Sequence, residues 1–350
     1  MVGFMLTFDV AMPFALFLVT LAALLLSKRV EGKLKSTFEA REFRTRDTIL
    51  LVVLISVAVS VVVFVPQMAL IALFMFSYAS LLFTFSYLFS GLHKKKALLF
   101  ISAFLFASLV VGTVALLGPF AGDFLFYGSL AAYGLAVFAF AAILVELRRA
   151  SSSGRWYLAL LPPALFVIVF FVFNPTPVWF PFLFDAFGVT FAILITLYLS
   201  SLFIWKTTFI FAALLTVMDF ILVLVIPVME PAATSIASLG LPVFIVLPII
   251  PPVFITSGLF GLQPIALGLG DFFFAGTLAT QTYKKFGKRT AIISAITMSV
   301  AFGIFEILLL NTDFGAFPGT LMIILGWVPV VAWKIVAERK TKNALIGKEV

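Results

Sequence analysis

The chain of 350 residues is too apolar for a water-soluble protein, because 63% of its residues are hydrophobic, only 11% are charged, and the mean hydropathy is +1.24. A soluble core cannot bury so much apolar surface, whereas a bilayer accepts it helix by helix, at about 20 residues per span. The lack of cysteine excludes disulfides and thiolate chemistry, and the single histidine, His93, excludes sites with two imidazoles. Any chemistry must therefore use carboxylates, and we expect no metal and no cofactor.

Apolar runs of spanning length predict an all-α polytopic membrane protein, a bundle of about eleven transmembrane helices. The runs cover residues 8–27, 48–65, 68–90, 97–118, 124–146, 156–174, 186–205, 207–228, 263–283, 290–310 and 318–337. Segment 241–259 is also apolar, but it holds four prolines, and proline at this density breaks a helix. We therefore predict that 229–262 is an outer or re-entrant connection, partly sunk in the membrane against protein. Residues 1–206 are expected to form a scaffold of seven helices, and 207–350 a region of four.

The basic residues are confined to alternate loops. All 23 Lys and Arg residues fall on one side of the predicted topology, within 28–46, 94–96, 148–155, 206, 284–289 and 334–348. The charged residues of the opposite loops are all acidic: Asp9, Asp123, Asp185, Glu230 and Asp313. Because cytoplasmic loops carry the excess of Lys and Arg, the N-terminus is predicted outside and the C-terminus inside. The same pattern accounts for the net charge of +8, so we expect a lipid bilayer as partner and no nucleic acid.

Three acids, Asp219, Asp271 and Glu306, lie well inside predicted spans, where a carboxylate costs about 2.5 to 3.5 kcal/mol. Asp219 is 13 residues from Lys206, and Asp271 is 13 residues from Lys284. Both are therefore expected about 20 Å from the basic side, on neighbouring antiparallel helices where they can face each other. Glu306 is near the outer end of its helix, and its carboxylate is expected to reach water by snorkelling.

Facing carboxylates have a chemical consequence. They cannot both ionise at close range, so they share a proton and act together as an acid and a base. Such a pair can activate a water for attack on a peptide carbonyl without a metal. Buried acids also mark ion or proton paths in transporters, so position alone leaves hydrolysis and transport open.

The residues around the two acids favour hydrolysis. Gly268-Leu269-Gly270 weakens the helix before Asp271 and exposes backbone beside the acid, which suits the close approach of a substrate strand. The run Ala-Leu-Gly-Leu-Gly-Asp-Phe-Phe-Phe ending at Phe274 resembles the Gly-Leu-Gly-Asp motif of the presenilin and signal peptide peptidase family of intramembrane aspartyl proteases.

Two further segments resemble this family. Val217-Met218-Asp219-Phe220 is similar to its Tyr-Asp helix, and Pro318-Gly319-Thr320 occupies the place of its Pro-Ala-Leu motif. The order and spacing match over 207–337, and the spans before residue 207 exceed those of the family's nine-helix pattern. Two departures stand out. Met218 replaces the usual tyrosine and removes a hydroxyl beside Asp219, while Gly319 and Thr320 replace Ala and Leu.

The resemblance implies an activity and a site. It implies hydrolysis of peptide bonds within transmembrane segments of membrane proteins or signal-peptide remnants, with Asp219 and Asp271 as catalytic residues. It implies substrate contacts at the remaining motif residues: Met218, Gly268, Leu269, Gly270, Pro318, Gly319 and Thr320. The partners are then transmembrane polypeptides, and the location is a prokaryotic, archaeal-type cell membrane, crossed many times.

Three alternatives stay open. A carboxylate-coupled membrane transporter is expected to show two related halves, whereas the deep acids and glycines here crowd toward the C-terminus. A catalytically inactive homologue would bind membrane proteins without cutting them. A prepilin-type peptidase resembles the Gly-x-Gly-Asp pattern, but its acids are expected near the cytoplasmic surface.

Overall fold

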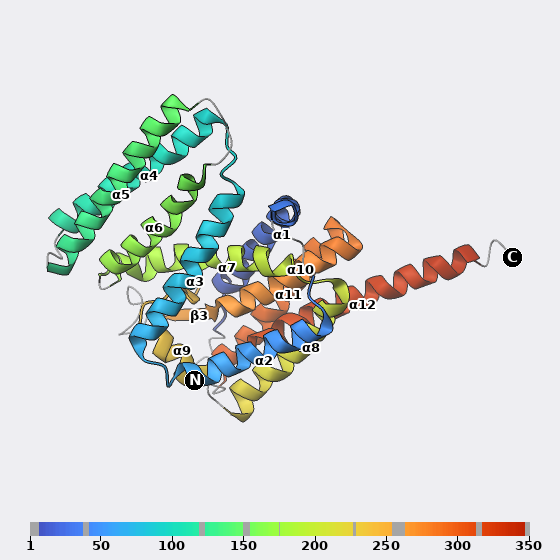
Figure 1. Cartoon of the computed structure of the whole chain (residues 1–350). Helices are drawn as coiled ribbons and strands as arrows, with labels where there is room; N and C mark the ends of the chain where they lie inside the picture. The colour runs from blue at the N-terminus through green and yellow to red at the C-terminus, as the bar shows by residue number, and fades with distance from the viewer. Residues whose placement is uncertain are drawn as a thin grey trace. The chain divides into compact units, whose positions relative to one another are not determined.

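A computed structural model describes residues 7–37, 42–118, 123–149, 155–174, 176–226, 229–253, 263–312 and 317–346 (Figure 1). Ten of its helices are long and apolar enough to cross a membrane. The described part is therefore that of a multi-pass, mainly α-helical membrane protein, which confirms the predicted fold class. The number of spans and their orientation remain predictions.

Short connections join the consecutive helices, except between α9 and α10, where the two strands lie. In chain order they are α1 (Ala11–Thr37), α2 (Thr45–Val62), α3 (Gln67–Leu88), α4 (Lys94–Leu117), α5 (Asp123–Arg148), α6 (Trp156–Phe173), the π-helical turn η1 (Trp179–Leu183), α7 (Phe184–Ser200), α8 (Trp205–Phe220), the π-helical turn η2 (Ile221–Val225), α9 (Met229–Ala237), α10 (Leu269–Phe286), α11 (Lys288–Leu310) and α12 (Gly319–Ile346). Each predicted apolar run overlaps one of these helices. The short α9 corresponds to none of them, and α10 is the one overlapping helix outside the ten apolar ones.

The start of the predicted span 263–283 is a strand and not a helix. β3 (Pro264–Gly268) pairs antiparallel with β1 (Phe244–Pro248), so that Gly268 lies opposite Phe244. The glycines and Pro264 disfavour a helix here, and the partner strand satisfies the backbone groups instead. Consequently α10 begins at Leu269, and Asp271 lies in its first turn.

The structure describes part of the predicted connection 229–262. It begins with the short helix α9 over 229–237, whereas residues 241–253 contain β1 and no helix. Residues 254–262 of the same predicted connection lie outside the described residues.

The chain forms two compact units. Unit 1 comprises 1–65, 187–238 and 242–350, and unit 2 comprises 66–186 and 239–241. In unit 1, α1 packs against α10 and α11, and α2 packs against α8. This grouping differs from the sequence-based division at residue 206, because the first two helices pack with the C-terminal ones.

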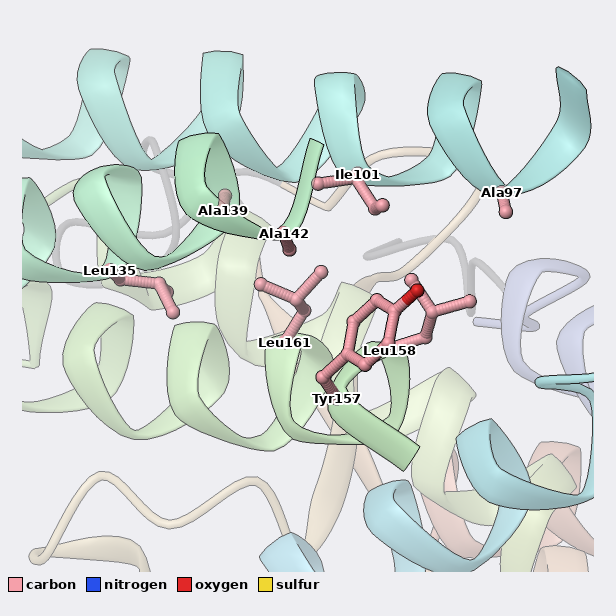
Figure 2. Close-up of a cluster of buried hydrophobic side chains, with 8 residues drawn as sticks. All are labelled: Ala97, Ile101, Leu135, Ala139, Ala142, Tyr157, Leu158 and Leu161. Atoms are coloured by element: carbon pink, nitrogen blue, oxygen red, sulfur yellow. The ribbon is translucent and has the colours of Figure 1, made fainter. Parts of the chain in front are cut away.

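Unit 2 has its own apolar core. Small and branched side chains of α4, α5 and α6 interlock there (Figure 2): Ala97, Ile101, Leu135, Ala139, Ala142, Tyr157, Leu158 and Leu161. At one end of this core, the buried Arg155 donates from Nε to both carboxylate oxygens of Glu146 at 2.9 Å. Tyr157 also donates to Glu146, and Arg155 Nη1 donates to the Leu92 carbonyl. The ion pair therefore joins α5 and α6 to the segment before α4.

Candidate active site

Ends of three helices in unit 1 bring the candidate residues together. Asp219 is in the last turn of α8, directly before the π-helical turn η2. Asp271 is in the first turn of α10, and α12 begins at Gly319. Both aspartates are partly exposed. Helix ends leave backbone groups without intrahelical partners, so this is a place where polar side chains find partners within an apolar bundle.

Two consecutive residues of α12 contact the two aspartates. The Thr320 hydroxyl donates to Asp219 Oδ2 at 2.6 Å, and the Thr320 backbone N–H donates to the same oxygen at 3.2 Å. A Cβ added to Gly319 would lie 2.4 Å from Asp271 Oδ1 and 2.7 Å from its Cγ. The backbone of Gly319 therefore approaches Asp271 more closely than any other residue type permits. The start of α12 therefore contacts both carboxylates.

The electrostatic surroundings favour one negative charge in the site. Asp219 and Asp271 are contacted by Thr320 and Gly319, which are consecutive residues of α12. Two helix N-termini, those of α10 and α12, adjoin the pair. Each carries about half a positive elementary charge, which stabilises an adjacent carboxylate. One negative charge in this site is therefore stabilised by both helix ends, whereas charges on both acids would repel each other.

Aromatic side chains pack α8 against α10 close to the two aspartates. Phe211 of α8 is fully buried, and its ring centroid lies 5.7 Å from that of Phe273 and 6.2 Å from that of Phe274. Phe211 precedes Asp219 by about two turns, at 3.6 residues per turn. These contacts fix the spacing of the two helices, and thereby of the carboxylates that they carry.

Helix α12 is held from two sides. Gly326 packs directly on α11, since a Cβ there would lie 2.4 Å from the Thr297 carbonyl oxygen. The neighbouring Trp327 donates from Nε1 to Thr282 Oγ1 of α10 at 2.8 Å. Both contacts lie about two turns after Gly319, so they set where α12 begins relative to the aspartates.

A polar contact missed by the sequence analysis anchors the far end of α10. The buried Gln281 donates from Nε2 to the carbonyls of Ser200 and Phe203, both at 2.9 Å. It joins α10 to the end of α7 and the connection to α8. The position of Gln281 within a predicted span could have indicated this contact, because an amide buried in the membrane needs hydrogen-bond partners.

The other motif residues have different surroundings. Leu269 is buried, and its N–H donates to the Val243 carbonyl at 3.0 Å. Gly270 is exposed, with open space where a Cβ would stand, and a Cβ on Gly268 would make ordinary contact with Asp271 at 3.5 Å. Neither glycine is required by the local packing. Pro318 is buried directly before α12, and Met218 is partly exposed beside Asp219.

The expectation for Glu306 is wrong. Its side chain does not reach water, because it is 1% exposed and buried on α11. Neither of its carboxylate oxygens has a hydrogen-bond partner among the described residues. The nearby Gly303 packs against Pro13 of α1. This close packing of α1 on α11 covers the surface along which the carboxylate was expected to snorkel.

Comparison with known proteins adds no assignment, because no protein-family model and no curated protein matches this chain.

Proposed function

We propose that this protein is an intramembrane aspartyl protease, which hydrolyses peptide bonds within transmembrane segments of membrane proteins or signal-peptide remnants. One observation carries the proposal. Asp219 and Asp271, which come from two helices, are both contacted by the first two residues of α12. The resemblance of Gly268 to Asp271 to the Gly-Leu-Gly-Asp motif supports the same assignment.

Two adjoining carboxylates supply both proton transfers that peptide hydrolysis needs. The ionised one takes a proton from water as the water oxygen bonds to the peptide carbon. The protonated one donates to the developing oxyanion. When the carbon–nitrogen bond breaks, a proton passes to the leaving amine, and the products are a carboxylic acid and an amine. The chain's own acids are sufficient for every step.

The substrate must be locally unwound, because a peptide bond within a helix is shielded by its neighbours and by lipid. Its freed backbone groups then need hydrogen-bond partners in an apolar medium. Strand β3 ends directly before α10, and Gly270 leaves open space beside Asp271. An extended substrate segment can pair with such a strand and reach the acids. We therefore expect spans that contain Gly, Pro or Ser to be cut preferentially over an all-Leu span.

The test is cleavage of a labelled single-span peptide in liposomes, with product masses recorded. Asp219→Asn and Asp271→Asn are each expected to abolish cleavage within the span. Glu306→Gln serves as the matched control, because it removes another buried carboxylate of unit 1 and is expected to leave cleavage intact.

The same assay separates the alternatives. If well-folded parent protein cuts none of several helix-destabilised substrates, the protease assignment fails, and transport or binding becomes the better explanation. Loss of cleavage in the Glu306→Gln control as well as in the two aspartate variants would show that the assay reports on folding and not on the pair.

A further inference from the structure

We propose that Thr320 is a positioning residue that holds Asp219 in the orientation required to activate water. This differs from the substrate contact implied by its place in the motif, and it rests on the proposed function above. The leucine of the family pattern has no side-chain hydrogen-bond donor at this place. The hydroxyl contact therefore belongs to this chain's own departure from the pattern.

Both donors of Thr320 converge on one oxygen. The hydroxyl and the backbone N–H bind Asp219 Oδ2, at 2.6 Å and 3.2 Å. No other hydrogen bond to this carboxylate comes from the described residues. Two donors on one oxygen fix the plane of the carboxylate group and leave Oδ1 without a donor among the described residues. Oδ1 is then the oxygen that takes the proton from water, because Oδ2 is already engaged.

The hydroxyl is rigidly placed. Thr320 is 5% exposed, and the helix that carries it is anchored by Gly326 and Trp327 about two turns further on. A threonine in the first turn of a helix usually bonds to nearby backbone. Here the acceptor is 101 positions away in the sequence. Such a bond contributes little to the stability of the N-terminal end of α12. Its main effect is to orient the Asp219 carboxylate.

Isosteric and conservative substitutions test the hydroxyl. Thr320→Val keeps the shape and the backbone N–H but removes the hydroxyl donor. We expect kcat to fall about 10- to 100-fold, since Asp219 loses a hydrogen bond to its charged group. KM should stay unchanged, because the lost bond does not contact the substrate. Thr320→Ser restores the donor and is expected to keep kcat within about threefold of the parent. Equal kcat in the Val variant and the parent would overturn the proposal, as would an increase in KM alone.

A second pair covers the case in which Thr320→Val does not fold. Thr320→Ala and Thr320→Ser differ from each other only in the hydroxyl, and both remove the methyl group. The proposal requires the Ser variant to be faster than the Ala variant by the same factor. Equal rates in the two variants would assign any loss to packing of the methyl group, and would refute a positioning role.

Crosslinking tests the contact without catalysis. The chain contains no cysteine, so Asp219→Cys combined with Thr320→Cys introduces the only thiols. A methanethiosulfonate reagent with a two-carbon bridge is expected to join them. Val217→Cys with Thr320→Cys is the matched control and should not react. Val217 is 56% exposed, and it lies two residues before Asp219, so its side chain points in a different direction from the helix. Failure of the 219–320 pair to crosslink would overturn the contact, whether or not the parent cleaves peptides. Crosslinking in a parent without protease activity would count against the proposed function alone.

Discussion

Gly319→Ala tests whether close approach of α12 sets the position of Asp271. The added methyl carbon would stand 2.4 Å from Asp271 Oδ1, whereas ordinary contact begins at 3.4 Å. The carboxylate, or the helix, must therefore move by about 1 Å. A misplacement of about 1 Å in a reacting group costs about 100-fold in rate, or about 2.7 kcal/mol of transition-state stabilisation. We expect kcat/KM for a single-span peptide in liposomes to fall by about this factor.

The effect on stability is expected to be no larger than the effect on rate. Overpacking costs about 1 to 3 kcal/mol, and the better helix propensity of alanine returns about 1 kcal/mol. The free energy of unfolding in detergent should therefore decrease by about 0 to 2 kcal/mol. Gly134→Ala is the matched control, because it adds the same methyl to α5 where nothing lies within 4 Å. Its rate should equal that of the parent. Parental kcat/KM in the Gly319→Ala variant would refute the inference that this glycine makes room for Asp271.

Three further substitutions test the packing by unfolding in detergent micelles. Arg155→Met should lower the free energy of unfolding by about 3 to 5 kcal/mol, because it leaves the buried carboxylate of Glu146 without its cation; a loss below about 1 kcal/mol would mean that water reaches this ion pair. Gln281→Leu should cost about 1 to 3 kcal/mol, since the buried Phe203 carbonyl loses its donor and the Ser200 carbonyl keeps only the 3.3 Å bond from Lys284, and an unchanged stability would contradict that anchor. Glu306→Met should instead stabilise the protein by about 1 to 3 kcal/mol, because two oxygens without described partners leave the interior. Destabilisation by Glu306→Met would indicate that the carboxylate has a partner.

The sequence alone was sufficient to predict the multi-pass membrane fold and to single out Asp219 and Asp271. A span must bring about 20 apolar residues into lipid, so the helices can be recognised from short windows of sequence without their neighbours. Asp219 and Asp271 are conspicuous for the same reason, since a carboxylate inside an apolar run is costly and rarely incidental. Their pairing followed from equal depth on neighbouring helices.

Only the tertiary structure decided the details of the site. The strand before Asp271 forms because β1, about twenty positions earlier, offers it backbone partners. The steric role of Gly319 and the hydrogen bonds of Thr320 depend on where α12 meets α8 and α10. Glu306 is buried because α1 packs over α11. Hydropathy and helical period can be read from one segment at a time, because they reflect only how that segment meets the lipid. The contacts of the site depend on how side chains from distant segments fit together, and no single segment encodes that.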